Sequence, residues 1–409
     1  MNVAIEIKPA IGAKDAKIIG LIGAAHFVSH YNALLLPPLF MLVRDDYGVS
    51  YTELGLALIA LNIAVAALQT PAGLLVDRIG ARAVLIAGLV LGAIGAAAAA
   101  LVSSFPVFIA MFALVGAGNA VFHPADYAIL SQAVSTRQAG TAFSIHTFAG
   151  ILGSAAAPVS LLFLQSLVGW RGAFASATIL GLAVAALLAA QRSEILEPVK
   201  SSSRQPSARA GETSGSHWSL LLSAPILLNF VFFMALSLTN GALQNYSIVA
   251  LAALYGVPTG FANAALSSYL MASALGVLVG GVMAHREVRP DVVACLCLLI
   301  VSSGALVIGF VALDSRLLLL TMASSGFFVG ALLPSRDMIV RAVTPQGAFG
   351  AVFGFVTTGF NIAGIAAPLI FGWLLDNGNP QGIFVAAAVC GFIAILTILA
   401  GHLRVFRVI

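Results

Sequence analysis

The chain has 409 residues, of which 60% are hydrophobic and only 8% are charged. Soluble globular domains carry about 25% charged residues. This composition therefore excludes a soluble enzyme, a disordered chain and a nucleic-acid-binding protein, because each of these needs far more surface charge. The mean hydropathy of +1.05 indicates a polytopic membrane protein instead.

Apolar runs separated by helix breakers predict an all-α protein with twelve membrane-spanning helices, since one crossing needs about 20 apolar residues. The polar stretch 192–217 is rich in Ser, Pro and Gly, which predicts a flexible linker between an N-terminal six-helix bundle (1–191) and a C-terminal one (218–409). The predicted helices are 18–42, 52–76, 82–102, 106–134, 140–168, 172–191, 219–252, 259–284, 291–313, 317–343, 347–375 and 380–403.

The distribution of Lys and Arg predicts the orientation. With both termini inside, fifteen basic residues fall on the inner side, and only Arg44, Arg171 and Arg316 fall on the outer side. This bias follows the positive-inside rule and places both termini in the cytoplasm. The remaining basic residue, Arg336, falls inside a span, where an ionisable group is costly and is a functional candidate by default.

The two halves repeat each other in sequence. Adding 210 to positions in the fourth and fifth helices gives matching residues in the tenth and eleventh, a relationship typical of transporters whose substrate lies between parallel halves. The matches are Gly116 with Gly326, Pro124 with Pro334, Gly140 with Gly350, Phe143 with Phe353, and Ala157-Pro158 with Ala367-Pro368. The same offset takes Asp126 to Arg336, so an acid and a base occupy equivalent positions.

A signature follows the second helix: Gly73-Leu-Leu-Val-Asp77-Arg78-Ile-Gly80-Ala-Arg82. Its glycines permit a tight turn, its basic residues hold the loop inside, and Asp77 can cap or pair with a neighbouring helix end. This stretch resembles the G-x-L-x-D-R-x-G-x-[RK] signature of the major facilitator superfamily. A decayed copy at offset 208 ends in His285 and Arg286. The resemblance implies a transporter, not an enzyme, with no cofactor.

A finer resemblance lies in the fourth helix, which reads Val115-Gly116-Ala-Gly118-Asn-Ala-Val121-Phe122-His123-Pro124. This stretch is similar to the fosmidomycin-resistance type of major facilitator. That group usually has an acid directly after the proline, whereas here Ala125 comes first and Asp126 follows, rotated by about 100°. The substrate of the group is therefore not carried over. The chain also departs from the drug–proton antiporter pattern, with Phe112 at the expected arginine.

Polar residues inside the spans are the site candidates, because burying them in a bilayer is costly. Asn119, His123, Asp126 and Tyr127 share one face of the fourth helix, and His26 and His30 are one turn apart on the first. The expected cavity residues are His26, His30, Tyr31, Asn32, Asn119, His123, Tyr127, His146, Asn240, Gln244, Asn245, Tyr269, Arg336, Thr358 and Asn361. The expected proton-coupling or gating residues are Asp126, His123, His30 and Arg336.

These residues predict a secondary transporter in a bacterial inner membrane that moves a small organic, anionic solute or drug by alternating access, coupled to protons and favouring efflux. Uptake of an organic anion or nutrient, and a transport-dead sensor or scaffold, are the alternatives. We expect a monomer in the bilayer, with no metal and with Cys295, Cys297 and Cys390 as packing residues. Helices one, four, seven and ten are expected to line the cavity, with Asp126 and Arg336 forming an inner gate and Asp337 pairing with Arg341.

Overall fold

The computed structural model describes residues 12–135, 138–191, 220–284, 289–345 and 349–405. Within these residues, eleven helices are long and apolar enough to cross a membrane. One of them, Thr141–Ala189, has 49 residues, about 74 Å of helix against a hydrocarbon core of about 30 Å. Its backbone is non-helical at Gly169 (φ 74°, ψ 171°), so it forms two spans. The described part of the chain therefore contains the predicted twelve crossings.

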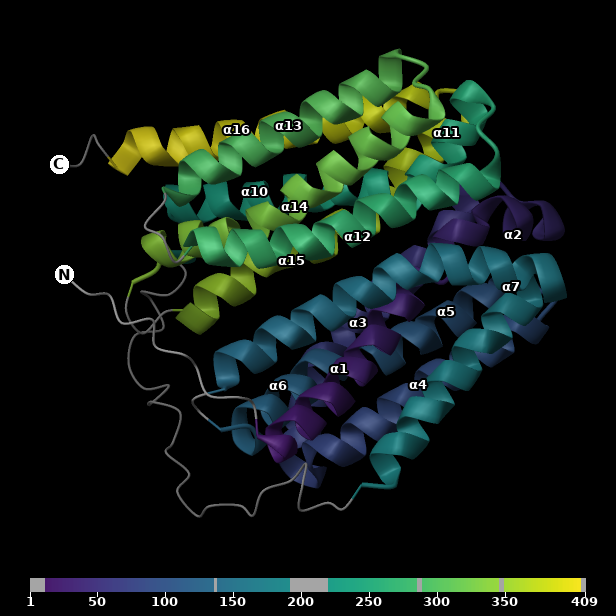
Figure 1. Cartoon of the computed structure of the whole chain (residues 1–409), viewed down its shortest axis with the longest axis vertical. Coiled ribbons are helices and arrows are strands. Elements are labelled where there is room, and N and C mark those ends of the chain that lie inside the picture. The colour runs from purple at the N-terminus through teal and green to yellow at the C-terminus, as the bar shows by residue number, and fades with distance from the viewer. Residues whose placement is uncertain (1–11, 136–137, 192–219, 285–288, 346–348, 406–409) are drawn as a thin grey trace.

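The first six crossings form one bundle and the last six form the other (Figure 1). The N-terminal bundle comprises α1 (Ala13–Ala33), η1 (Pro37–Leu39), α2 (Phe40–Tyr47), α3 (Tyr51–Ile79), α4 (Ala81–Leu101), α5 (Phe105–Asn119), α6 (Phe122–Ala133) and α7 (Ala139–Ala189). The C-terminal bundle comprises α10 (Ala224–Gly241), η2 (Ala242–Tyr246), α11 (Ser247–Tyr255), α12 (Thr259–Ala284), α13 (Pro290–Phe310), α14 (Ser315–Val343), α15 (Phe349–Asp376) and α16 (Gln381–Val405).

Three crossings are interrupted where the helix ladder is broken. A 3₁₀ turn at Pro37 follows α1, and α5 ends three residues before α6 begins. The second break lies one turn before Pro124, whose ring would clash with the carbonyl of Ala120 in a regular helix. The seventh crossing contains a π-helical turn, η2, between α10 and α11. The predicted linker 192–217, His285 and Arg286 lie outside the described residues.

Paired glycines confirm the internal repeat. Gly116 on α5 packs against the backbone of Leu61 on α3 so closely that no Cβ would fit, and Gly326 on α14 packs in the same way against Tyr269 on α12. Gly116 and Gly326 differ by 210, and Leu61 and Tyr269 differ by 208. Contacts of this kind let helix backbones approach closely inside a membrane, and here they hold equivalent helix pairs in both halves.

The two halves meet at the end of the molecule where α3 and α12 begin and α15 ends. Helix α3 packs against α15, and α7 against α12. Among pairs of described residues, every hydrogen bond between the halves joins α3 to α15; the innermost runs from Asn62 Nδ2 to the carbonyl of Gly364, at 3.2 Å. No such bond lies on the terminal side of Asn62. Among the described residues, the hydrogen bonds between the halves therefore lie at the predicted outer end and extend inward as far as Asn62.

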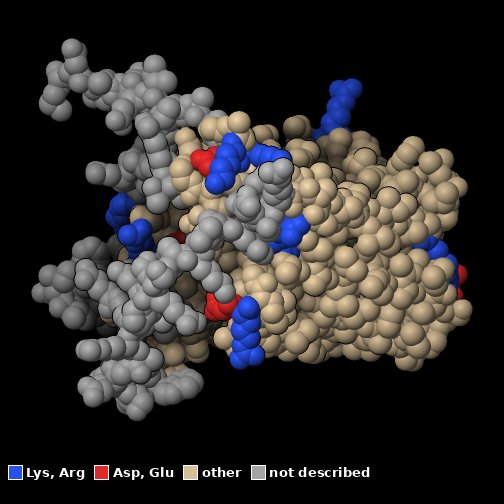
Figure 2. All heavy atoms as spheres, turned by 90° about the horizontal axis from the view of Figure 1, so that it is seen from below, with Lys and Arg blue, Asp and Glu red and all other residues tan. Residues whose placement is uncertain are grey.

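The surface matches a membrane protein. Lys, Arg, Asp and Glu side chains gather toward one end of the molecule, with a second group at the opposite end, and the surface between them is mostly uncharged (Figure 2). Large apolar side chains are exposed along this belt, including Leu101, Phe163 and Ile179, each more than 60% accessible. An apolar band of this kind is stable only against lipid.

Candidate functional site

Four histidines and one aspartate from three helices meet inside the N-terminal bundle. His26 and His30 come from α1, His123 and Asp126 from α6, and His146 from α7. The His26 ring stacks on that of His146, with centroids 3.6 Å apart, and lies 4.7 Å from His30 and 5.4 Å from His123. These residues, here called the His–Asp cluster, were predicted as separate groups, and the structure unites them.

Asp126 is the centre of the cluster. Its Oδ2 lies 3.0 Å from His146 Nε2 and 3.3 Å from His26 Nδ1. The side chain is fully buried, and Oδ1 has no hydrogen-bond partner among the described residues. A buried carboxylate with one unsatisfied oxygen carries a large desolvation cost. Such a group gains from picking up a proton or a positively charged partner.

The packing of α1 against α7 positions the imidazole rings. A Cβ on Gly150 of α7 would lie 2.6 Å from His26 Cδ2 and 2.9 Å from His30 Cδ2, so only glycine leaves room for both rings. His30 Nδ1 also lies 3.2 Å from Ser154 Oγ, one turn further along α7. Sequence patterns gave no indication of Gly150 or Ser154, because neither is ionisable and their role depends on which face of α7 meets α1.

A row of side chains connects the buried centre with the surface. His123 is exposed and Tyr127 is 47% accessible. The Tyr127 ring centroid lies 5.7 Å from that of His123 and 5.6 Å from that of His146. Among the described residues of this row, the hydrogen bond shown is the one between His146 and Asp126, so the rings mark a direction from the buried carboxylate to the exposed face rather than a continuous hydrogen-bonded chain.

The cluster also contains metal-ligating atom types. Atoms of His26, Asp126 and His146 lie within 4.8 Å of one another. However, the His26 and His146 rings are stacked with an interplanar angle of only 24°. Their nitrogen lone pairs therefore lie in two nearly parallel planes, whereas a shared zinc ion would have to lie close to both ring planes, about 2.0–2.1 Å from each nitrogen. Of the two rings, His146 hydrogen-bonds to Asp126, whereas His26 Nδ1 lies 3.3 Å from Oδ2 and has no hydrogen-bond partner among the described residues.

Arg336 forms the corresponding charged centre of the C-terminal half. Its guanidinium carbon lies 5.0 Å from the Phe233 ring centroid and 5.4 Å from that of Phe360, which places it in cation–π range of both. Its Nη2 lies 2.8 Å from Asp337 Oδ1. The expected Asp337–Arg341 pair is therefore wrong: the 18% exposed side chain of Arg336, held between two rings, lies closer to the carboxylate.

Asp126 and Arg336 each have partners within their own half. Asp126 contacts His146 and His26, and Arg336 contacts Asp337. The structure shows no ion pair between Asp126 and Arg336, so the predicted gate is not formed in this conformation. Its formation in the opposite state stays a prediction.

The remaining predicted residues lie in both halves. Ser29 Oγ donates to Asn119 Oδ1 at 2.5 Å, and the hydroxyls of Tyr31 and Ser160 lie 2.9 Å apart. Tyr269 donates to Asn240 Oδ1 at 3.1 Å. These contacts tie together helices of a single half, so several of these polar residues serve packing. Asn32 is buried, and Gln244 and Asn245 are partly buried. Thr358 and Asn361 are exposed on α15.

The signature loop acts as a helix connector. Gly80 is both the C-cap residue of α3 and the N-cap residue of α4. Its φ of 96° is a backbone conformation that favours glycine. Arg82 donates to the carbonyls of Leu188 (3.3 Å) and Ala189 (2.7 Å) at the end of α7, where a cation suits the helix dipole. Asp77 and Arg78 are exposed, and Asp77 caps no helix among the described residues; Gly73 faces Pro124.

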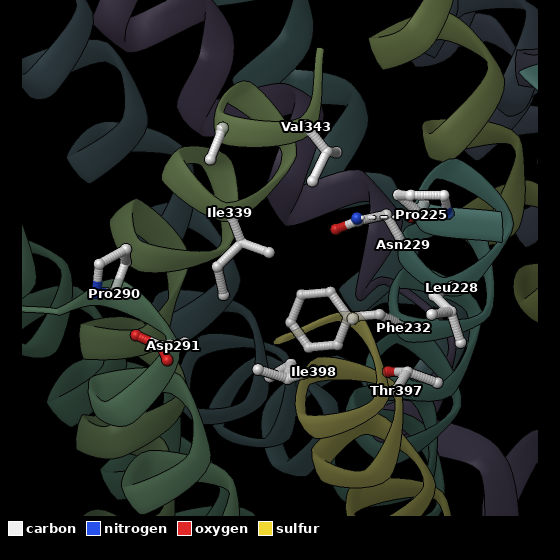
Figure 3. A pocket seen from close by; sticks show the side chains of 12 residues that line it. Pro225, Leu228, Asn229, Phe232, Pro290, Asp291, Ile339, Val343, Thr397 and Ile398 are labelled. Atoms are coloured by element: carbon white, nitrogen blue, oxygen red, sulfur yellow. Dashed lines mark hydrogen bonds between the residues drawn. The ribbon is translucent and has the colours of Figure 1, made fainter. Parts of the chain in front are cut away.

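A separate cavity of about 270 Å³ lies within the C-terminal half, between α10, α13, α14 and α16 (Figure 3). Its walls include Phe232, Ile339 and Ile398, with the polar groups Asn229 and Asp291 at its edge. None of the predicted site residues lines it. Because it lies inside one half rather than between the two, we do not assign it to the transport route.

Comparisons with known proteins agree with this architecture. The sequence profile of the Major Facilitator Superfamily matches residues 22–262 and 235–405. The chain is 24% identical to the uncharacterised MFS-type transporter YfnC of Bacillus subtilis, over 86% of this chain and 88% of that one. It is 23% identical to a probable sulfoacetate transporter, SauU, of Cupriavidus necator, over 88% and 87%.

Solved structures share the fold at low identity. A bacterial homologue of the human lysosomal transporter Spinster, in an inward-facing and occupied conformation, superposes with a TM-score of 0.74 at 14% identity, covering 96% of this chain and 98% of that one. The nucleoside transporter NupG gives 0.75 at 14% identity, covering 94% and 99%. Together with the profile match over both halves, these findings show that the chain is a multi-pass membrane protein and belongs to the major facilitator superfamily, a family of transporters of small solutes rather than enzymes.

Proposed function

We propose that this protein moves a small organic anion across a bacterial inner membrane by alternating access, in exchange for protons. The buried Asp126 carboxylate, contacting His146 and His26 and linked through His123 and Tyr127 to the exposed face, carries this proposal. Ionisable groups at bilayer depth serve proton relays in pumps and transporters. The His–Asp cluster is the proton site of the N-terminal half, with His30 as a further titrating group.

The anion site belongs to the C-terminal half. Arg336 is the intramembrane cation there, and its planar guanidinium can bind a carboxylate with two parallel hydrogen bonds. The flanking Phe233 and Phe360 rings hold it in place from two sides. The similarity to a probable sulfoacetate transporter supports a substrate with carboxylate or sulfonate groups.

Export is proposed ahead of import. The chain is 25% identical to the multidrug resistance protein MdtH of Aeromonas salmonicida over 85% of each chain, and its fourth helix is similar to the fosmidomycin-resistance type. Uptake of an organic anion uses the same two charged centres and is the second candidate. We further propose a monomer with cytoplasmic termini, an N-terminal bundle over 1–191, a cytoplasmic linker over 192–217 and a C-terminal bundle over 218–409.

Flux into proteoliposomes tests this function. The purified protein is reconstituted, a pH gradient is imposed in either direction, and uptake of labelled sulfoacetate and a panel of small carboxylates, amines and drugs is measured. We expect gradient-dependent flux of a carboxylate or sulfonate that is lost in Arg336→Gln. Flux restricted to cations would contradict the anion assignment, and no flux for any member of the panel would favour a sensor or scaffold.

A further inference from the structure

A carboxylate of the C-terminal half caps a helix of the N-terminal half at the outer end of the α3–α15 interface. Asp376, the last residue of α15, accepts hydrogen bonds from the backbone amides of Tyr51 and Thr52, each at 2.8 Å. It also accepts one from the Thr52 hydroxyl at 2.5 Å. Tyr51 is the first residue of α3, so both amides belong to the first turn, where the helix itself supplies no acceptor.

The capping of α3 is divided between the two halves. Ser50 Oγ accepts a hydrogen bond from the amide of Glu53 at 3.1 Å, and this cap stays within the N-terminal half. The two preceding amides, of Tyr51 and Thr52, are satisfied by Asp376 from the other half. The negative carboxylate also suits the positive end of the α3 dipole. When the outer ends separate, α3 loses these acceptors and Asp376 loses three donors.

The backbones of α3 and α15 also approach each other closely around the Asp376 contact. A Cβ on Gly372, one turn before Asp376, would lie 2.7 Å from Thr52 Cα, and a Cβ on Gly55 would lie 2.8 Å from Pro368 Cβ. These glycines let the first turn of α3 come within reach of the Asp376 side chain. The carboxylate and the two glycines therefore form one continuous contact strip between the halves.

The equivalent interface on the other side of the molecule has no such contact. The offsets of 208 and 210 take Thr52 to Gly260 and Asp376 to Ser166. Ser166 Oγ donates to the carbonyl of Phe163 within α7, at 2.7 Å. The site of a Cβ on Gly260 meets only the Leu162 side chain, at 3.8 Å. The α3–α15 and α7–α12 pairs thus share a fold but differ in polar chemistry, and among the residues that the structure describes the carboxylate cap lies at α3–α15.

We propose that Asp376 is a positioning residue for alternating access: it latches the outer ends of the halves together in the inward-facing state, and its three hydrogen bonds break when the outer side opens. The proposal rests on the transport cycle proposed above. Removing the latch favours the outward-facing state, because the inward-facing state alone loses stabilisation. Hydrogen bonds to a charged group each contribute enough to change an equilibrium by roughly tenfold or more.

Distances between spin labels at the outer ends test the latch without a substrate. Leu101 at the end of α4 and Val311 next to the end of α13 are equivalent positions in the two halves, and both are exposed. Labels are attached to Leu101→Cys and Val311→Cys after the three native cysteines are replaced by alanine. Pulsed electron-spin resonance in liposomes then gives the populations of short and long outer distances.

The expected result is an increase of more than about tenfold in the ratio of long to short outer distances in Asp376→Ala, because all three hydrogen bonds to the carboxylate are lost. Asp314→Ala is the matched control: the Asp314 carboxylate caps α14 through the amides of Arg316 (2.8 Å) and Leu317 (3.0 Å), but wholly within one half. It should leave the ratio unchanged. Thr52→Val removes one of the three hydrogen bonds and should shift the ratio in the same direction, by a smaller factor. This variant replaces Asp376→Ala as the test of the latch if Asp376→Ala does not fold.

An unchanged ratio in both Asp376→Ala and Thr52→Val would overturn the latch, as would an equal shift in Asp314→Ala, which would show general loosening. Failure of the proposed function has a different signature. A shifted distance ratio with no flux of any solute would refute transport and keep the latch, whereas robust flux with an unshifted ratio would refute the latch alone.

Discussion

Replacing Asp126 by asparagine separates proton coupling from substrate movement. The side chains have nearly the same shape, and an amide oxygen can still accept a hydrogen bond from His146 Nε2, 3.0 Å from Asp126 Oδ2 in the native protein. The amide cannot take up or release a proton. Asp126 is fully buried, its Oδ1 has no partner among the described residues, and no basic side chain of the C-terminal half pairs with it there. The substitution therefore removes the negative charge of the carboxylate without leaving a cation of the other half unpaired.

The magnitude follows from the gradient. One proton exchanged per substrate across a pH difference of one unit supplies about 1.4 kcal/mol, which drives accumulation of up to about tenfold. We expect the parent protein to approach this ratio and Asp126→Asn to stay near one. Substrate exchange between equal concentrations should continue, because it needs no net proton transfer. Stability should change little, because the amide keeps the hydrogen bond from His146 and the substitution removes a buried charge with an unpaired oxygen.

The assay compares accumulation and exchange in the same proteoliposomes, with Asp314→Asn as the control for a carboxylate outside the cluster. Accumulation by Asp126→Asn at the parent level would refute the role of Asp126 and pass it to His30. Loss of both accumulation and exchange, together with a lowered melting temperature, would show that Asp126 serves folding rather than coupling.

Three further predictions follow from the packing and charge of the site. Gly150→Ala should abolish transport and lower stability by about 1–3 kcal/mol, because the new methyl group would overlap His26 and His30; Gly20→Ala, whose Cβ meets nothing within 4 Å, should be neutral in both flux and thermal unfolding. Arg336→Lys should raise KM severalfold while keeping some flux, since lysine retains the charge but loses the bidentate geometry; an unchanged KM for every anion would contradict the anion site. Asp126→Arg and Arg336→Asp should each block transport while the double exchange recovers part of it, and a double variant as inactive as the singles would argue against a gate between them.

The fold was predictable because the signals are long and redundant. Twelve apolar runs, the repeat at offset 210 and the signature loop all give the same architecture, and an error of a few residues at any helix end does not change it. Local irregularities within the helices were harder to predict from the sequence. Pro124 explains the break between α5 and α6, but the π-helical turn η2 contains no proline or glycine that would mark it in the sequence.

The site was predictable only as separate pieces. Helical spacing places His123 and Asp126 on one face, but it does not say that this face meets His26 on α1 and His146 on α7. That assembly depends on the rotation of three helices about their axes, and Gly150, which makes room for the rings, has no chemistry that marks it. The Asp337–Arg341 expectation failed for a related reason: helix spacing alone ignores the Phe233 and Phe360 rings that hold Arg336 beside Asp337.

The two halves share a backbone plan but have divided the chemistry. At equivalent positions, Asp126 is surrounded by imidazoles and Arg336 by phenyl rings and a carboxylate. Each charge is thus stabilised within its own half, so separating the inner ends leaves neither charge without a partner. Closing the inner side would bring the carboxylate of Asp126 and the guanidinium of Arg336 toward each other. This state is favoured only if their attraction is stronger than the contacts that each already makes with the histidines or with Asp337. An anion bound to Arg336 or a proton bound to Asp126 would weaken that attraction. The proton and the anion would therefore act from opposite halves on the same equilibrium between the inward-facing and outward-facing states. Asp376 would act on this equilibrium at the outer end, where it opposes separation of the halves.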